Sequence, residues 1–139
     1  MNHPTATRRI TVAKVPDQER MEILPRYFGH HMIRAEIAVY TAMEALCEAY
    51  HGGFWDYFEL SNGAFYMAPR LEGPLQIACE SNGYAGEMSA DAAGIVASLF
   101  ALNAMTWTTE DPRFGQLYYG LRDFADGHPE AAAIFAAID

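Results

Sequence analysis

The sequence predicts an α+β fold, a single compact domain with a small antiparallel sheet built from hairpins and packed against about four to five helices. Two observations support this prediction. Asn-Gly pairs at positions 62–63 and 82–83 each separate two runs of strand-forming residues, which is the pattern of a β-hairpin. Segments with apolar residues at helical spacing precede and follow this block. We expect residues 1–15 to be a tail or an edge segment and residues 16–139 to be the domain.

The first predicted helix follows Asp17, whose side chain can cap it. Its apolar residues recur at helical spacing, at Met21, Leu24 and Phe28. Pro25 lies inside this pattern and marks a kink or the start of a new turn, and Gly29 then ends the helix.

The second predicted helix runs from about His31 to Tyr50 and has a clear apolar face. Glu36 falls in the middle of that face, which makes it the candidate buried carboxylate. Burial would raise its pKa, as a general acid requires, and Asp56 or Glu59 would be its partner carboxylate. The alternative is a structural role, close to the positive end of the helix dipole and paired with Arg26 or an aromatic hydroxyl.

The first hairpin spans residues 55–69, and its Asn-Gly pair suits a two-residue type I′ turn. That turn places Leu60 opposite Phe65 and Glu59 opposite Tyr66. One face of the hairpin is then core. The other face is aromatic and acidic and contains Trp55, Tyr57, Glu59 and Tyr66. Exposed aromatic residues beside an acid are typical of interfaces, so we predict a partner-binding surface there, with coverage by a helix as the alternative.

Three further helices complete the predicted fold after a second hairpin. Ser89 or Asp91 begins a central core helix that continues to Met105. Asp111 followed by Pro112 begins the fourth helix, and the His-Pro-Glu sequence at 128–130 begins the last one in the same way.

Charge and composition narrow the function. The chain has 18 acidic and 9 basic residues and a net charge of −9, and Arg34 is followed by only three bases in 105 residues. Direct DNA binding needs clustered lysines and arginines, so we do not expect it. The two cysteines fit a reducing compartment, and neither a signal peptide nor a membrane span is apparent. We expect a cytoplasmic protein.

The motifs of common catalytic and cofactor sites are missing from the sequence. The histidines lack metal-ligand spacing, and neither a phosphate-binding glycine loop nor a Gly-x-Ser-x-Gly nucleophile elbow occurs. We therefore predict no metal, no cofactor and no catalytic residue. The carboxylates around Glu36 leave a small carboxylate-dependent enzyme open as an alternative.

Several stretches of the chain are similar to one known family. They are Glu22-Ile-Leu-Pro-Arg-Tyr-Phe-Gly29, residues 46–55 and 58–69, Ser89-Ala-Asp-Ala-Ala-Gly-Ile-Val96, and the ending from His128 to Asp139. In order and without large gaps, these stretches resemble the KlcA/ArdB family of antirestriction proteins, most closely its plasmid-borne KlcA branch. The resemblance implies a small α+β fold and the protection of incoming unmodified plasmid DNA from type I restriction-modification enzymes inside a bacterium. It supplies no catalytic residues.

The distribution of acidic residues bears on the mechanism that this resemblance implies. The acids are scattered singly, and only Glu110 and Asp111 are adjacent, which is a poor imitation of the phosphate rows of DNA. We therefore favour interference with a protein partner, either the type I restriction machinery or a host factor controlling it. The alternatives are a DNA mimic that inhibits the restriction enzyme and a plasmid-maintenance adaptor. The sequence leaves the oligomeric state open.

Overall fold

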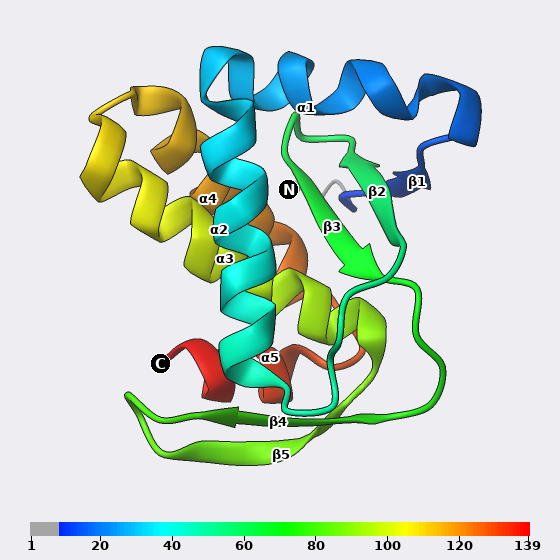
Figure 1. The fold of residues 1–139 in the computed structure, drawn as a ribbon, viewed down its shortest axis with the longest axis vertical. Helices are drawn as coiled ribbons and strands as arrows, with labels where there is room; N and C mark the ends of the chain where they lie inside the picture. Colours follow the sequence, from blue (N-terminus) through cyan, green and yellow to red (C-terminus); the bar gives the residue numbers. More distant parts are fainter. Residues whose placement is uncertain (1–8) are drawn as a thin grey trace, which may run out of the picture.

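Two small antiparallel sheets and five α-helices make up residues 9–139, the part of the chain that the computed structural model describes (Figure 1). The strands are β1 (Val12–Lys14), β2 (Trp55–Leu60), β3 (Phe65–Pro69), β4 (Leu75–Cys79) and β5 (Tyr84–Met88). The helices are α1 (Arg20–Phe28), α2 (Met32–Leu46), α3 (Ala90–Thr109), α4 (Pro112–Asp126) and α5 (Ala131–Ile138). The predicted α+β class is confirmed, with the hairpins placed in two separate sheets.

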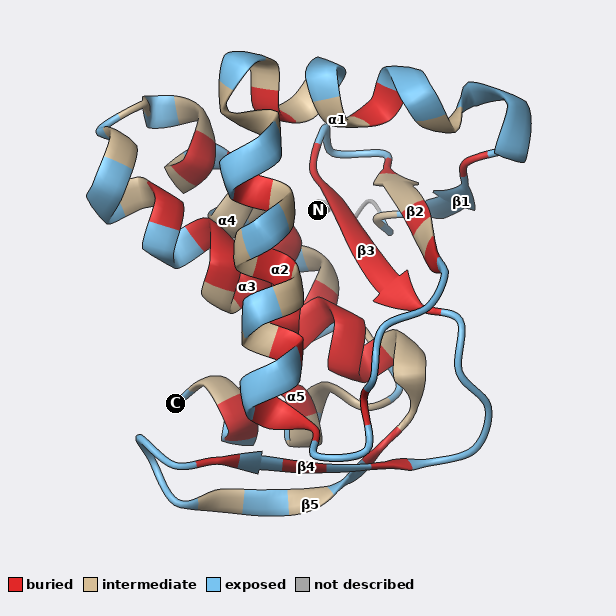
Figure 2. Cartoon of the chain, viewed as in Figure 1, coloured by how far each residue is buried: buried red, intermediate tan, exposed pale blue. Residues whose placement is uncertain are grey.

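The two hairpins lie apart and are covered differently. Strands β1, β2 and β3 form one sheet in that order, while β4 and β5 form a two-stranded sheet at the other end of the molecule (Figure 1). Strand β3 is buried along its whole length, whereas β4 alternates between buried and exposed residues (Figure 2). Part of the predicted edge segment, Val12–Lys14, forms the exposed strand β1, and residues 1–8 lie outside the described residues.

The long helix α3 is the centre of the core, as predicted. Its N-terminus is capped by Ser89, whose side chain accepts a hydrogen bond from the Ala92 N–H. Among the described helices, α3 is the one long and apolar enough to cross a membrane, but 61% of that apolar window is buried inside the protein. Helix α4 also starts as predicted, with Asp111 as its cap and Pro112 at its first position.

Two helices near the N-terminus differ from their predictions. Asp17 begins a short 3₁₀ turn without capping α1, and Met21 is 92% exposed while Ile23 is buried in its place. Helix α2 ends at Leu46, four residues early, because the chain turns there to bury Tyr50. The Tyr50 hydroxyl accepts a hydrogen bond from the indole N–H of Trp55, a tertiary contact that helical periodicity does not encode.

The first hairpin has a different register from the predicted one. A three-residue loop, Ser61 to Gly63, joins β2 to β3, so Glu59 lies opposite Phe65 and Phe58 opposite Tyr66. Only Gly63 of this loop has a positive φ, whereas a type I′ turn needs two such residues. The side chain of Asn62 instead accepts the Ala64 N–H and donates to the carbonyl of Gly120 in α4. The one-residue slip turns one strand over relative to the other, so Tyr57 and Glu59 share a face with Phe65 and Phe58 shares one with Tyr66.

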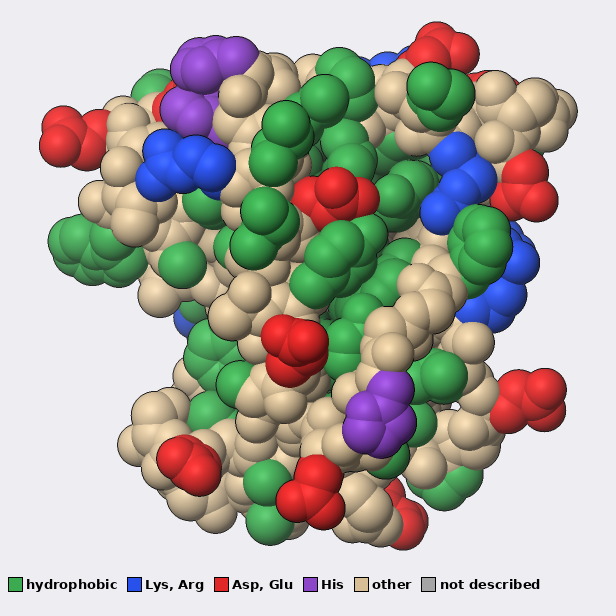
Figure 3. All heavy atoms as spheres, in the orientation of Figure 1, with side chains coloured by type: hydrophobic (Ala, Val, Ile, Leu, Met, Phe, Trp, Pro, Cys, Tyr) green, Lys and Arg blue, Asp and Glu red, His purple; other side chains and the backbone are tan. Residues whose placement is uncertain are grey.

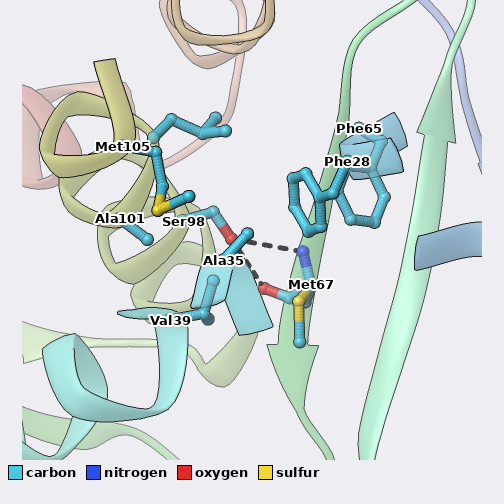
Figure 4. A pocket seen from close by; sticks show the side chains of 9 residues that line it. Phe28, Ala35, Val39, Phe65, Met67, Ser98, Ala101 and Met105 are labelled. Atoms are coloured by element: carbon cyan, nitrogen blue, oxygen red, sulfur yellow. Dashed lines mark hydrogen bonds between the residues drawn. The ribbon is translucent and has the colours of Figure 1, made fainter. Parts of the chain in front are cut away.

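The two edges of the three-stranded sheet are in contrasting environments. At the β3 edge, the Ser98 hydroxyl of α3 accepts a hydrogen bond from the Met67 N–H at 3.2 Å and donates one to the Met67 carbonyl at 3.3 Å (Figure 4). Ser98 is buried, and it and Met67 both line a small cavity of about 10 Å³. Strand β1 at the opposite edge is exposed throughout (Figure 2). Within the part of the chain that the structure describes, the β3 edge is thus closed and the β1 edge is open.

Candidate functional site

The predicted aromatic surface on the first hairpin is not exposed. Trp55, Tyr57 and Tyr66 are 2%, 7% and 2% exposed, and the corrected register puts Tyr66 on the opposite face from the other two. Helices α1 and α2 cover the Trp55 face, where the ring of Tyr27 stacks on Phe65. The alternative of coverage by helices therefore describes this hairpin. Among residues 9–139, the large hydrophobic side chains that are exposed lie outside this hairpin, namely Val12, Met21, Ile33, Ile37, Phe54, Leu71, Trp107 and Tyr119.

The candidate carboxylates each have a separate partner. Glu36 is half-buried on α2 and accepts a hydrogen bond of 2.8 Å from the Tyr40 hydroxyl, which is the aromatic partner that the structural alternative named. Glu59 accepts hydrogen bonds from Arg26 and from the Tyr27 hydroxyl. Asp56 binds Arg70, as described below. Each candidate carboxylate is thus bound to a different group, and no hydrogen bond joins one of them to another among the described residues.

Asp56 binds three cations that come from distant parts of the chain. Arg70 donates two hydrogen bonds to its carboxylate, at 2.6 and 3.3 Å, while Lys14 lies 3.6 Å and Arg20 4.0 Å away. The hydrogen bonds from Arg70 lower the pKa of Asp56 below its ordinary value, so it stays ionised. The guanidinium groups of Arg20 and Arg70 each lie over the ring of Phe54. Asp56 thereby ties β1 to the β2–β3 hairpin.

A large concave site lies beside the open edge of the sheet. It is a cleft of about 690 Å³ between β1, one face of β2 and β3, and the turn that joins α4 to α5. Its floor is aromatic, because the ring of Tyr66 stacks on Phe58 at 4.8 Å and on Phe124 at 5.8 Å. Lys14 and Arg9 lie on the β1 side. The cleft therefore combines an apolar floor with basic residues along one wall.

The far wall of the cleft is a hydrogen-bonded network. Tyr66 donates from its hydroxyl to one oxygen of Asp91 at 2.6 Å, and His128 Nε2 lies 2.8 Å from the other oxygen. Glu130 extends the network, because its carboxylate accepts hydrogen bonds from the N–H and the hydroxyl of Ser89. Residues from β3, the start of α3 and the start of α5 are thereby held together.

Hydrogen bonding assigns the protonation of this network. The Glu130 N–H donates to Nδ1 of His128, so the neutral ring carries its proton on Nε2 and donates to Asp91. Burial, and then the hydrogen bond to Asp91, raises the pKa of the Tyr66 hydroxyl, which stays protonated at neutral pH. Burial favours the neutral form of Glu130, but its bonds to Ser89 outweigh that effect and keep its pKa low. With both ring nitrogens engaged, His128 positions the wall and has no free nitrogen to act as a base.

The described residues hold neither a cluster of metal ligands nor an exposed thiol. Within residues 9–139, no group of three or more His, Cys, Asp and Glu side chains is arranged to hold a metal ion. Cys47 and Cys79 are both buried free thiols.

Comparison with known proteins identifies the family. The family model described as antirestriction protein matches residues 48–139. The chain belongs to the antirestriction protein family. It is 49% identical to an antirestriction protein KlcA of Escherichia coli over 94% of each chain, and 46% identical to a second KlcA over 97% of this chain and 99% of the relative. An uncharacterized protein, YfjX of strain K12, is 37% identical over 94% of this chain and 88% of its own length.

A solved structure shares the fold over nearly the whole chain. Its TM-score is 0.91 at 48% identity, and the match covers 99% of this chain and all of the other. The proteins described with that structure, KlcA and ArdB, show a novel fold and antirestriction activity against type I DNA restriction systems in vivo but not in vitro. The family predicted from the sequence stretches is confirmed, and the antirestriction fold includes both sheets described above.

The fold brings together two residues of the stretches shared with the antirestriction family to which the sequence analysis gave no functional role. Asp91 and His128 lie in the two stretches that begin at Ser89 and at His128, and both stretches begin helices. Each was explained by its helix start alone. The available signal was the pairing of a polar residue at one helix start with a histidine at another, but nothing in the spacing shows that β3 brings them into contact.

Proposed function

We propose that this antirestriction protein protects incoming unmodified DNA from type I restriction-modification enzymes by contacting a protein in the bacterial cytoplasm. The family and the near-full-length similarity to KlcA support the antirestriction activity. The partner is the restriction machinery or a host factor that controls it. The proposal includes no catalytic step.

The arrangement of the acidic side chains is the observation that favours protein contact over DNA mimicry. A mimic needs rows of free carboxylates at the spacing of phosphates, one charge per ~1.7 Å of duplex axis. Here several carboxylates are instead bound to groups of their own chain, namely Glu36, Asp56, Glu59, Asp91 and Glu130. On the face in Figure 3, the acidic side chains lie as separate groups among uncharged and apolar surface.

The behaviour of the solved relative fits the same proposal. KlcA and ArdB are described as active against type I systems in vivo but not in vitro. A mimic that occupies the DNA groove of the enzyme would act in both settings, because its target is the enzyme itself. A requirement for the cell is the behaviour expected when the relevant contact involves a further cellular component.

Phage plating tests the proposed activity. Unmodified phage is plated on cells carrying a type I system, with and without this protein, and modified phage controls for toxicity. We expect plating to rise for unmodified phage alone. No rise in cells that contain the soluble protein would contradict the activity.

Salt dependence tests the proposed mechanism. Charge mimicry makes binding to the DNA-recognition subunit tight at low salt and far weaker as salt rises. We expect no such binding by the purified protein. Tight association with that subunit that weakens steeply between low and physiological salt would establish mimicry in place of protein interference.

A further inference from the structure

Within residues 9–139, no backbone or side-chain group is hydrogen-bonded to the outward edge of strand β1. The Val15 N–H donates to the carbonyl of Tyr57, and the carbonyl of Thr11 accepts from the Ser61 N–H. The backbone N–H and C=O groups of the odd-numbered residues in this segment therefore point toward β2. Antiparallel pairing alternates along a strand, and Val12 and Lys14 therefore point their N–H and C=O groups away from the sheet. Two donors and two acceptors lie along this edge, and among the strands of the described residues β1 is the last on its side of the sheet.

Folds ordinarily protect the edge strands of their sheets, whereas the β1 edge is exposed. The matching groups of Met67 at the β3 edge are bound by Ser98 and covered by α3, whereas residues 11–14 are exposed to solvent. An open edge is a template for a further strand, which adds through main-chain hydrogen bonds. Such additions gain specificity when alternate side chains of the new strand enter a pocket.

The cleft is placed to receive those side chains. Val12, Lys14, Phe58 and Tyr66 lie on one face of the sheet according to the observed register, and all four line the cleft. Residues of an added strand that hydrogen-bond to Val12 and Lys14 place their side chains on this same face. The residues that bind the edge are thus the ones that reach the cleft.

Charge and polarity define the segment that fits. The floor, formed by Phe58 and Phe124, is only partly covered and suits an aromatic or aliphatic side chain. Arg9 and Lys14 flank the edge and suit carboxylates on either side of that anchor. The side chain of Lys14 is 55% exposed despite its contact with Asp56, so its ammonium group can also bind a second carboxylate.

We propose that the β1 edge and the adjoining cleft bind an extended acidic segment of a protein, which adds as a fourth strand beside Val12–Lys14 and inserts one apolar side chain above Phe58 and Phe124. This inference rests on the proposed function in one respect, because both require a protein partner. It adds the location of the contact and the chemistry of the bound segment.

A short synthetic peptide tests this inference without any restriction enzyme. In the peptide, glutamate, phenylalanine and aspartate alternate with threonine, so that the acidic and aromatic side chains share one face. Titrated into ¹⁵N-labelled protein, it is expected to shift the amide resonances of Val12 and Lys14 and to slow their hydrogen exchange. A peptide with lysine and arginine in place of the acids should bind at least about tenfold more weakly, a difference of about 1.4 kcal/mol.

Variants separate edge pairing from a general surface effect. Val12→Pro removes the outward N–H and should weaken the acidic peptide at least about tenfold, whereas Val12→Thr keeps that N–H and should bind within about threefold of the parent protein. Arg9→Glu reverses an exposed charge and supplies a second test should the proline variant fold poorly. Shifts confined to other elements, or equal binding by folded Val12→Pro and Val12→Thr, would overturn the inference.

The two proposals can fail separately. Peptide binding at β1 without any protection of unmodified phage would leave the edge site standing and contradict the antirestriction activity. Protection of phage by a protein whose β1 amides ignore the acidic peptide would contradict the edge site alone.

Discussion

The two outer edges of the three-stranded sheet differ in how their backbone groups are bound. At β3, the N–H and C=O of Met67 both bind the hydroxyl of Ser98, and helix α3 packs so closely that Gly94 touches Ala68. At β1, the outward groups of Val12 and Lys14 face solvent beside a cleft. The β3 edge is therefore covered within the fold, whereas no described residue covers the β1 edge.

Closing the β3 edge depends on a glycine in α3. A Cβ atom at Gly94 would lie 2.5 Å from the Cα of Ala68 and from the carbonyl oxygen of Met67, which are backbone atoms that cannot move aside. We expect Gly94→Ala to lower the free energy of unfolding by about 3 kcal/mol, measured by urea denaturation. Gly115→Ala is the matched control, because its Cβ meets nothing within 4 Å, and it should stabilise α4 by about 0.5–1 kcal/mol. A Gly94→Ala protein as stable as its parent would contradict the close packing.

The hydroxyl of Ser98 is the second contribution to the closed edge. Ser98→Ala leaves the buried N–H and C=O of Met67 without partners, at a cost of about 1–3 kcal/mol. Ser61 offers the comparison beside β1, where its hydroxyl accepts the Thr11 N–H in an exposed position between this segment and the hairpin. Water replaces that bond, so Ser61→Ala should cost no more than about 0.5 kcal/mol. Equal losses in the two alanine variants would mean that the edges do not differ as described.

Acid should loosen the tie between β1 and its hairpin. The hydrogen bonds from Arg70 lower the pKa of Asp56 in the folded protein. Ionised Asp56 therefore stabilises the fold at pH values above the ordinary aspartate pKa of about 4, and this stability is lost as the pH falls through the lowered pKa. The difference in unfolding free energy between the parent and Asp56→Asn should be largest at neutral pH and shrink below about pH 4. Urea denaturation at a series of pH values measures this difference. A gap that stays constant with pH would show that ionised Asp56 does not hold β1.

The smallest stability effect is expected at the open edge itself. Val12→Pro removes an N–H that points to solvent, so the free energy of unfolding should change by no more than about 0.5 kcal/mol. Ala13→Pro is the matched substitution at the next residue, where the backbone N–H faces Glu59 of β2. Its loss of a ladder hydrogen bond should cost at least about 1 kcal/mol more. A reversed order in chemical denaturation would mean that the outward and inward residues of β1 have been exchanged.

Local sequence signals predicted the elements well and the contacts between them poorly. The caps at Ser89 and Asp111 act within one helical turn, so the starts of α3 and α4 could be predicted from neighbouring residues. The register of the first hairpin could not, because Asn62 also binds a carbonyl in α4. The end of α2 was misplaced for a similar reason, since Tyr50 leaves the helix to reach Trp55.

The candidate site shows the same limit more strongly. Asp91 and His128 are separated by 37 residues, and Tyr66 joins them from a strand in the other half of the chain. The interface predicted at Trp55, Tyr57, Glu59 and Tyr66 assumed a free hairpin face. Covering that face requires two helices whose packing no periodicity reveals. The open edge of β1 depends on strand order, which is set by long-range pairing.

The central claim is that protection of unmodified DNA depends on the open β1 edge and not on surface acidity. Efficiency of plating of unmodified phage on cells with a type I system tests it, with the parent protein, Val12→Pro and a quadruple variant with Glu22→Gln, Glu44→Gln, Asp123→Asn and Asp126→Asn, all present as soluble folded protein. The account predicts protection by the parent and the quadruple variant and none by Val12→Pro. Protection by Val12→Pro together with its loss in the quadruple variant would contradict the account and favour imitation of DNA.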